Sequence, residues 1–187
     1  PTATAAGYAD AIVRDMYYNT VSGQFKAIKE GGAPLGAWAS GASMNTARME
    51  FPGAGANKDA GIAITGYKES SQTLYTNVED YNGTAWTEKG DVNTARKGAG
   101  AFGSNTVAFC VDGALNPPGA SQDLVESWNG TAWTETTENN TARCMIEGQS
   151  VSTSVPTGII IGGGTPPGYG TTEVAVTETW NGSAWTE

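Results

Sequence analysis

The sequence predicts an all-β protein built from repeated four-stranded antiparallel units, and three observations support this fold class. The segment [Tyr/Trp]-Asn-Gly-[Thr/Ser]-Ala-Trp-Thr-Glu occurs three times, at 81–88, 128–135 and 180–187. The segment Asn-Thr-Ala-Arg is interleaved with it and ends at Arg48, Arg96 and Arg143, which are 48 and 47 residues apart. Glycine and alanine are abundant, most of the remaining residues are Thr, Ser, Asn, Val and Ile, and long runs of helix formers are few, which favours strands and turns. Such a period indicates one supersecondary unit stacked several times.

The first two strands of each unit are expected directly after the arginine. The first strand is rich in small residues and is predicted at 53–56, 98–101 and 148–154. Large side chains do not fit on a crowded axis, so glycine and alanine belong on the innermost strand. The second strand is an apolar run that ends at glycines, and it is predicted at 62–64, 107–111 and 159–161.

The third and fourth strands form a hairpin around Asn-Gly, a dipeptide suited to tight turns. The third strand is predicted at 78–81, 125–128 and 176–180, and the fourth begins at Trp86, Trp133 or Trp185. A two-residue loop would place Trp86 opposite Glu79, whereas a four-residue loop would place it opposite Tyr81. In both registers the two aromatic residues share one face of the sheet. We expect each aromatic pair to pack against the next unit.

One glutamate also recurs, two residues before the aromatic residue of the third strand. It is Glu79, Glu126 or Glu178. We expect it to pair with the repeated arginine, which offers bidentate geometry to a carboxylate. The pair would close one unit or bridge two adjacent units.

A four-stranded unit of this period matches the blade of a β-propeller. The order of arginine, small-residue strand, apolar strand with glycines, Val-Glu-x-[Tyr/Trp] and Trp resembles the kelch repeat over roughly residues 38–187. Ile161-Gly162-Gly163-Gly164 matches the double-glycine signature, while Thr65-Gly66-Tyr67 and Asp112-Gly113-Ala114 lack one glycine. The resemblance implies kelch-like blades at about 46–88, 93–135 and 140–187, with a partial unit in 36–45.

The Asn-Gly-Thr-Ala-Trp-Thr and Asn-Thr-Ala-Arg variants are similar to kelch-like segments of marine bacteriophage structural proteins. Residues 17–26 also resemble a short β element of phage tail-fibre and appendage proteins. Residues 1–37 are expected to form a β-hairpin, with strands at 15–19 and 24–28. This hairpin is either an outer addition to the propeller or an element that anchors the module to a particle.

Three full blades do not show how a propeller would close into a ring, because propellers typically contain four to eight blades. The N-terminal segment could add a partial blade, subunits could combine, or sequence beyond Glu187 could complete the ring. We expect assembly with other copies of the chain or with other virion proteins.

Composition excludes several function classes. The formal net charge of −9 disfavours nucleic acid as a partner. The chain has no histidine, which removes the commonest general base and transition-metal ligand. Cys110 and Cys144 are either two buried thiols or a single disulfide bridge. No apolar run is long enough to span a membrane. No cofactor or metal site is expected, although calcium on scattered loop carboxylates stays open.

Candidate sites fall into two groups. The three arginines resemble the arginine triad of sialidases, but their identical repeat positions favour a structural role. The connections that differ between repeats, 68–77, 115–122 and 165–172, are better places for specificity. The candidate binding residues are Tyr75, Asn116 and Tyr169 in these connections and Tyr67 directly before the first one. The Asn-x-Ser/Thr sequons at Asn82, Asn129, Asn139 and Asn181 are mostly the hairpin turns themselves.

The leading hypothesis is a non-enzymatic bacteriophage virion structural protein: a tail fibre, head fibre or capsid-decorating appendage. Its rigid blades would hold variable loops outward towards host-surface glycans or neighbouring subunits. The alternative is a free extracellular bacterial propeller that binds carbohydrate or mediates adhesion. An enzyme ranks third, because an active site normally breaks the symmetry of a repeat.

Overall fold

The computed structural model describes residues 16–19, 23–27, 40–115, 120–150, 157–165 and 172–187, and the chain divides into compact units 1–41 and 42–187. In the first unit, Met16–Asn19 (β1) pairs antiparallel with Gln24–Ala27 (β2), with Met16 opposite Ala27. A hairpin is predicted at this place, and its expected end residues Asp15 and Ile28 lie outside the described residues. The partial unit expected at 36–45 lies partly outside them, and 40–45 forms no strand.

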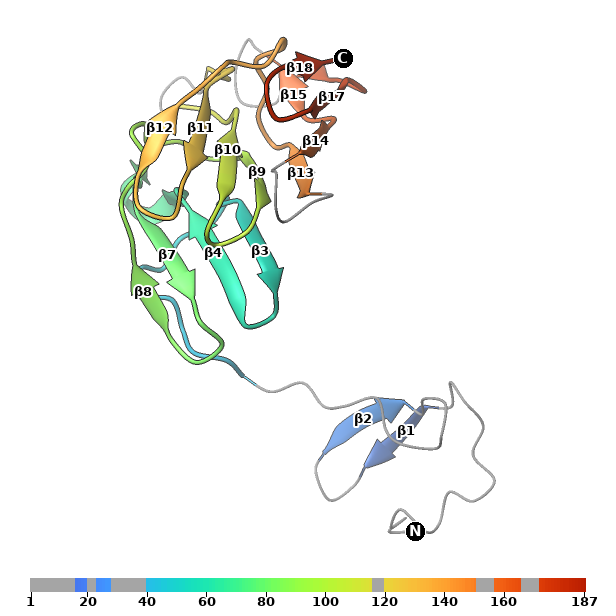
Figure 1. Cartoon of the computed structure of the whole chain (residues 1–187). Coiled ribbons are helices and arrows are strands. Elements are labelled where there is room, and N and C mark those ends of the chain that lie inside the picture. Colours follow the sequence, from blue (N-terminus) through green and yellow to red (C-terminus); the bar gives the residue numbers. More distant parts are fainter. Residues whose placement is uncertain (1–15, 20–22, 28–39, 116–119, 151–156, 166–171) are drawn as a thin grey trace. The chain divides into compact units, whose positions relative to one another are not determined.

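The second unit contains three four-stranded antiparallel sheets, one for each repeat (Figure 1). Sheet 1 is formed by β3 (Gly53–Asn57), β4 (Ala60–Ile64), β7 (Val78–Tyr81) and β8 (Trp86–Glu88). Sheet 2 is formed by β9 (Gly100–Gly103), β10 (Ala108–Val111), β11 (Val125–Trp128) and β12 (Trp133–Glu135). Sheet 3 is formed by β13 (Glu147–Ser150), β14 (Gly158–Ile161), β17 (Thr177–Trp180) and β18 (Trp185–Thr186). The described part of the chain contains no α-helix.

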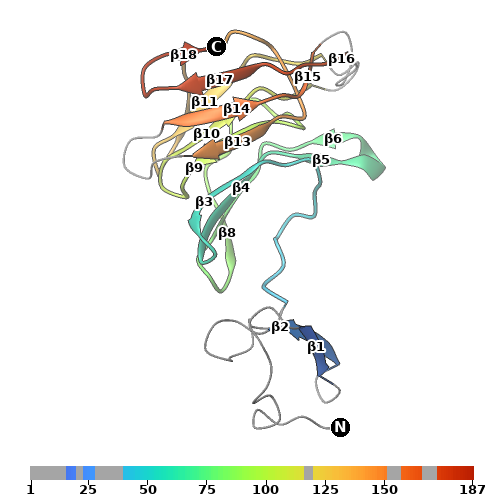
Figure 2. The ribbon, with the colours of Figure 1, turned by 90° about the vertical axis from the view of Figure 1, so that its right-hand side faces the viewer.

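The connection between the second and third strands of each sheet carries a small antiparallel pairing of its own. These pairings are β5 (Tyr67–Lys68) with β6 (Thr73–Leu74), an isolated bridge from Ala114 to Ser121, and β15 (Gly164–Thr165) with β16 (Thr172–Glu173). A 3-10 turn, η2 (Glu69–Ser71), joins β5 to β6. Figure 2 shows β5–β6 and β15–β16 on the same side of the sheets. Residues 68–77 are therefore more ordered than the open loop that the sequence predicts.

Two first strands differ from their predicted bounds. In sheet 2 the strand is β9, which begins at Gly100 rather than at Gly98. Gly98 has a positive φ of 59° and donates its N–H to the carbonyl oxygen of Glu50, so it bends the chain between two sheets. In sheet 3, β13 covers the first part of the predicted strand 148–154, and residues 151–154 lie outside the described residues.

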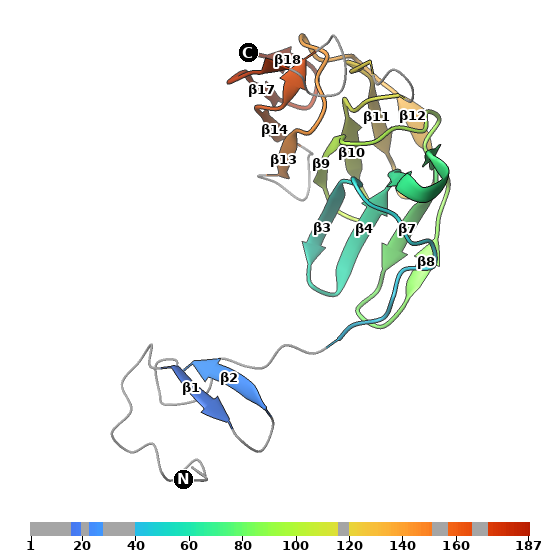
Figure 3. The ribbon, with the colours of Figure 1, turned by 180° about the vertical axis from the view of Figure 1, so that it is seen from behind.

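The sheets pack face to face through their apolar residues, with β9 lying against both β3 and β13 (Figures 1 and 3). The cluster between sheets 1 and 2 includes Ile62, Ile64, Val78, Cys110, Trp128 and Trp133. The cluster between sheets 2 and 3 includes Phe102, Phe109, Val111, Ile160, Trp180 and Trp185. The small residues expected on the innermost strands allow this close approach.

The aromatic pair of sheets 2 and 3 packs against the preceding sheet, so the expected packing against the next unit is wrong. The reason is the register. Trp128 lies opposite Ala108, which lies opposite Gly103, and directly opposed residues share one face of an antiparallel sheet. That face meets sheet 1, whereas Phe109 lies on the other face and meets sheet 3.

The hairpin between the third and fourth strands has the four-residue loop. Tyr81 lies opposite Trp86, with ring centroids 5.0 Å apart, and the corresponding tryptophan pairs are 5.4 and 5.3 Å apart. The Asn82 side chain closes the loop, since its Oδ1 accepts hydrogen bonds from the N–H groups of Thr84 and Ala85. Gly83 supplies a positive φ of 88°. In this loop the asparagine contributes a side-chain acceptor, and the glycine contributes the positive φ angle.

Candidate functional site

Each repeated arginine lies on the glutamate of its own sheet. Arg48 Nη1 is 2.8 Å from Glu79 Oε1, Arg96 Nη1 is 2.5 Å from Glu126 Oε1, and Arg143 Nη2 is 2.8 Å from Glu178 Oε1. The side chains of all six residues are fully buried. The expected pairing is present, and it closes a single sheet.

The Asn-Thr-Ala-Arg segment explains how a buried charge pair is tolerated. In sheet 2, the N–H groups of Asn93 and Thr94 donate to the Glu126 carboxylate at 2.7 and 3.3 Å. Arg96 Nη2 also donates to the carbonyl oxygen of Cys110 at 3.2 Å. The same backbone contacts reach the glutamates of the other two sheets, from Asn45, Thr46 and Asn140. A buried ion pair is stable only when such hydrogen bonds replace water.

Burial and charge act in opposite directions on Arg96. Burial alone would lower the pKa of its guanidinium, but Cys110 and Glu126 outweigh burial and raise that pKa above its ordinary value. Burial also raises the pKa of the Cys110 thiol. Cys110 and Cys144 are both free and buried, so the interpretation as two buried thiols is confirmed.

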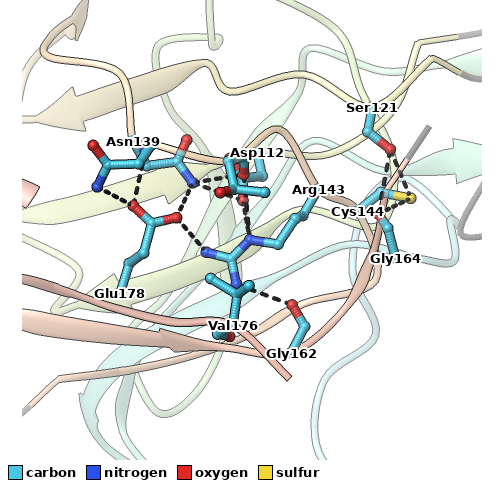
Figure 4. Close-up of polar contacts among 11 residues, drawn as sticks. Asp112, Ser121, Asn139, Arg143, Cys144, Gly162, Gly164, Val176 and Glu178 are labelled. Atoms are coloured by element: carbon cyan, nitrogen blue, oxygen red, sulfur yellow. Dashed lines mark hydrogen bonds and ion pairs between the residues drawn. The ribbon is translucent and has the colours of Figure 1, made fainter. Parts of the chain in front are cut away.

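A second polar contact joins neighbouring sheets, as Figure 4 shows for sheets 2 and 3. Asp112 follows β10, and its Oδ2 lies 3.8 Å from Nε of Arg143. Asn139 Nδ2 donates to Asp112 Oδ2 at 3.1 Å and to Glu178 Oε1 at 3.4 Å. The N–H of Gly113 donates to the carbonyl oxygen of Arg143 at 2.9 Å. The arginine therefore completes its own sheet and ties that sheet to the preceding one.

Thr65 has the equivalent place between sheets 1 and 2. Its Oγ1 donates to the carbonyl oxygen of Arg96 at 2.7 Å and accepts from the N–H of Arg96 at 3.1 Å. Thr65, Asp112 and Gly162 all have positive φ angles, of 51°, 58° and 64°. The two positions that depart from the double-glycine signature thus accept a left-handed backbone and gain an inter-sheet contact.

Asp112 is the most perturbed carboxyl group of this cluster. Burial raises its pKa to about 8, although Arg143 and Asn139 act in the opposite direction. The carboxyl is therefore mostly protonated at neutral pH. The sequence marks Thr65 and Asp112 as departures from the double-glycine signature and Asn139 as a sequon residue, but it assigns none of them to an inter-sheet contact. The usable signal was a polar residue at an aligned glycine position.

Each buried Arg–Glu pair, together with the contacts that tie its arginine to the neighbouring sheet, forms what we call a joint. The joints offer little opportunity for chemistry on a substrate. Each arginine is bonded to a different glutamate within a different sheet, so the three do not converge on one carboxylate as a sialidase triad would. Their side chains are closed off from solvent. Among the described residues, no group of three or more histidine, cysteine, aspartate or glutamate side chains could hold a metal ion. The arrangement is suited to holding sheets together.

The candidate binding residues are placed unequally. Tyr67 is only 4% exposed and lies under the ammonium group of Lys97, which is 4.1 Å from the ring centre. The interpretation of Tyr67 as an exposed loop residue is wrong, because β5 draws it into the joint. Tyr75 is half-buried, and its N–H donates to the carbonyl oxygen of Gly66. Asn116 and Tyr169 lie outside the described residues.

The exposed part of these connections is polar. In the first repeat, Lys68, Glu69 and Ser70 are exposed, and η2 contains no buried residue. In the third repeat, Thr172 and Glu173 are exposed. Such residues can bind a polar ligand through hydrogen bonds, and they differ from one repeat to the next.

The tryptophans and sequon asparagines have structural surroundings. Trp133 and Trp185 are 6% and 9% exposed, whereas Trp86 is half-buried and donates from Nε1 to the carbonyl oxygen of Ala42. Asn129 and Asn181 repeat the loop-closing contacts of Asn82, while Asn139 is buried beside Asp112. The sequons are therefore parts of turns and of a joint.

No protein-family model and no curated protein matches the chain. A solved structure entitled "Structure of YjhT", a kelch-like protein, is similar to it, with a TM-score of 0.63 at 14% sequence identity. The similarity covers 91% of this chain and 50% of that one, so the chain spans about half the length of the structure that it matches. At this identity the likeness concerns the fold alone. Within the described residues, no helix has the length and apolarity needed to cross a membrane.

Proposed function

We propose that sheets 1–3 are kelch-like blades of a β-propeller, and that the chain is a non-enzymatic structural module of a bacteriophage virion. The observation that carries the non-enzymatic part is the use of every repeated arginine and glutamate in a closed joint. The likeness to YjhT supports the blade arrangement through the fold. The phage assignment is supported by the resemblance of the repeated segments to marine phage proteins.

The module would act as a scaffold. Buried ion pairs and aromatic clusters fix each blade on its neighbour, which keeps the connections between second and third strands at one end. These connections differ in sequence and expose polar groups such as Lys68 and Glu69. We assign them to contacts with host-surface glycans or neighbouring virion proteins. The hairpin of β1 and β2 would anchor the module.

The location is tested on purified particles of a phage whose genome carries this sequence. Mass spectrometry should find the chain at a fixed copy number, and cryo-electron microscopy should place it on a fibre or a capsid surface. A chain that is absent from washed particles but present in the culture supernatant would overturn the virion assignment. That result would favour the free adhesion propeller.

Glycan binding is tested separately with a glycan array. The variant Lys68→Ala changes a connection at the proposed binding end, and Lys58→Ala is its control, because Lys58 is exposed in the β3–β4 turn at the opposite end of sheet 1. A glycan signal that weakens with Lys68→Ala alone would support binding through the connections. Absence of any signal would restrict the module to contacts with other proteins.

A further inference from the structure

The exposed large apolar side chains of the described residues lie at the two ends of the row of sheets. Met49 and Phe51, at 45% and 38% exposure, precede sheet 1. Met145, at 58%, precedes sheet 3, and Ile161, at 46%, ends its second strand. Contiguous exposed apolar groups commonly mark an interaction surface.

The same repeat positions are buried wherever a neighbouring sheet covers them. Ile161 corresponds to Ile64 and Val111, which are both 0% exposed. These two residues pack against the aromatic pair of the following sheet. Ile161 lies on the matching face of sheet 3, opposite Thr177 in the register of β14 and β17. Ile161 therefore occupies an interface position, but none of the described sheets covers it.

Sheet 1 shows the complementary half of that interface. Phe51 corresponds to Ala99 and Ile146, which are 6% and 5% exposed within the two internal interfaces. The aromatic pair of Tyr81 and Trp86 is only half-buried. In sheet 2 the equivalent Trp128 and Trp133 are covered by sheet 1 and are 2% and 6% exposed. One end of the row thus offers a partly exposed aromatic pair, and the other offers the aliphatic face that such a pair packs on.

The backbone repeats this complementarity. At the internal joints, Gly66 N–H donates to Arg96 and Gly113 N–H donates to Arg143. Within the described residues, the equivalent N–H of Gly163 has no backbone acceptor, and no backbone N–H donates to the carbonyl oxygen of Arg48. Two groups that would complete a third joint therefore lie at opposite ends of the row.

A surface depression marks where that joint would form. It is lined by Met145, Gly163, Gly164, Glu173 and Val174. The equivalent residues of sheet 2 are Gly98, Gly113, Ala114, Ser121 and Gln122, and they receive the Arg143–Met145 segment: Gly113 and Gly98 bond to it, and Gln122 bridges Arg143. The depression is therefore lined by residues equivalent to those that bind the Arg143–Met145 segment, so it can bind the corresponding segment of another chain.

We infer that a second copy of this chain docks there, so that sheet 1 of each copy packs against sheet 3 of the other. Both halves of the interface lie on one chain, and they continue an interface that the chain already makes twice. Two such head-to-tail contacts close a two-fold ring of six sheets. The similarity covers 50% of the YjhT structure, which leaves a part of similar size for a second copy. The inference rests on the blade arrangement proposed above, but neither on a virion location nor on a glycan.

One pair of positions should face each other across the two copies. At the joint between sheets 2 and 3, Ser121 Oγ is 3.4 Å from Cys144 Sγ. The equivalent of Ser121 in sheet 3 is Glu173, and the equivalent of Cys144 before sheet 1 is Met49. Side chains that point toward each other at such short range mark candidate positions for a disulfide, which needs Cα atoms about 4.4–6.8 Å apart. Glu173 and Met49 are both exposed, so their substitution leaves the native cysteines buried.

The first test is the mass of the full chain in sedimentation and light scattering at micromolar concentration. We expect twice the chain mass of 19.3 kDa. Ile161→Lys should shift the protein to the monomer mass with an unchanged circular dichroism spectrum. Thr134→Lys, on an exposed outer-strand position, is the matched control and should stay dimeric. A native chain that is monomeric in this range would overturn the inference, while the particle and glycan results would stand.

The second test mixes the separate variants Met49→Cys and Glu173→Cys under mild oxidation. We expect a covalent dimer that neither variant forms alone, and none when Thr134→Cys replaces Glu173→Cys. An assembly larger than a dimer with the same cross-link would overturn the two-copy ring. Equal cross-linking in the Thr134→Cys control would overturn the docking geometry.

Discussion

The carboxyl group of Asp112 lies 3.8 Å from Nε of Arg143, and the two residues belong to neighbouring sheets. Arg143 is at the same time bonded to Glu178 of its own sheet at 2.8 Å. One guanidinium thus faces two buried carboxyl groups. Burial raises the pKa of Asp112 to about 8, although Arg143 and Asn139 lower it.

The raised pKa of Asp112 predicts a loss of stability as the pH rises. The folded chain holds this proton up to about pH 8, whereas the unfolded chain releases it near the ordinary pKa of 3.8. Because the folded state binds more protons in this window, the free energy of unfolding falls with pH, by roughly 6 kcal/mol in total at about 1.4 kcal/mol per pKa unit. Asp112→Asn should flatten this slope in urea titrations across the window. Asp59→Asn, at an exposed position, should leave it unchanged. An equal slope in Asp112→Asn and the wild type would contradict the prediction.

Breaking a buried ion pair should be costly. Arg96→Met leaves the Glu126 carboxylate buried without its partner, and we expect a loss of about 3–5 kcal/mol in the free energy of unfolding. Lys58→Met is the matched control, because Lys58 and Asp59 pair in the open, with side chains 87% and 55% exposed. Its effect should stay within about 0.5 kcal/mol. Chemical denaturation of both variants measures the difference, and similar losses would argue against the joint as a stabilising unit.

A single methyl group should separate two equivalent glycines. A Cβ on Gly158 would lie 2.4 Å from the ring of Phe102 on sheet 2, whereas a Cβ on Gly61 would meet nothing closer than 3.8 Å. We expect Gly158→Ala to lower the free energy of unfolding by about 1–3 kcal/mol through overpacking. Gly61→Ala should be close to neutral. Calorimetry of the two variants is decisive, since a neutral Gly158→Ala would mean that sheets 2 and 3 are not packed as described.

The hairpin asparagine should act through its oxygen. Asn129 Oδ1 accepts from the N–H groups of Thr131 and Ala132, each at 2.9 Å. Asn129→Ala removes both bonds and should cost about 1 kcal/mol. Asn129→Asp keeps the acceptor and should retain most of the stability. Urea midpoints of the two variants measure the contrast, and equal losses would assign the effect to the backbone of the turn.

The period of the sequence was sufficient to predict the order of strands and the partners of the ion pairs. Arg96 and Glu126 hold repeat positions that recur in every unit, so an ion pair formed in one unit is expected in all three. The direction of packing could not be predicted, because alternation places Trp128 and Phe109 on opposite faces without saying which neighbour each face meets. The sequence left two registers for the third and fourth strands, and the pairing of Tyr81 with Trp86, with the Asn82 contacts that close the loop, distinguishes them.

The inter-sheet contacts escaped prediction for a different reason. Thr65 and Asp112 occupy positions where the repeat expects glycine, and a departure from a pattern does not indicate what the new side chain binds. Tyr67 was misplaced because the connections differ between repeats, so alignment could not show that β5 buries it. Variable segments carry the least internal evidence about their own structure.

The arginine and the glutamate of each buried ion pair come from the same repeat, and this affects how such a chain can evolve. Arg96 and Glu126 are encoded 30 residues apart, so a duplicated gene segment of one period carries its own neutralised pair. Copies can therefore be added or lost without stranding an unpaired ion in the interior. Asp112 and Arg143 lack this independence, since they come from successive copies, and their contact fixes the order of those two neighbours.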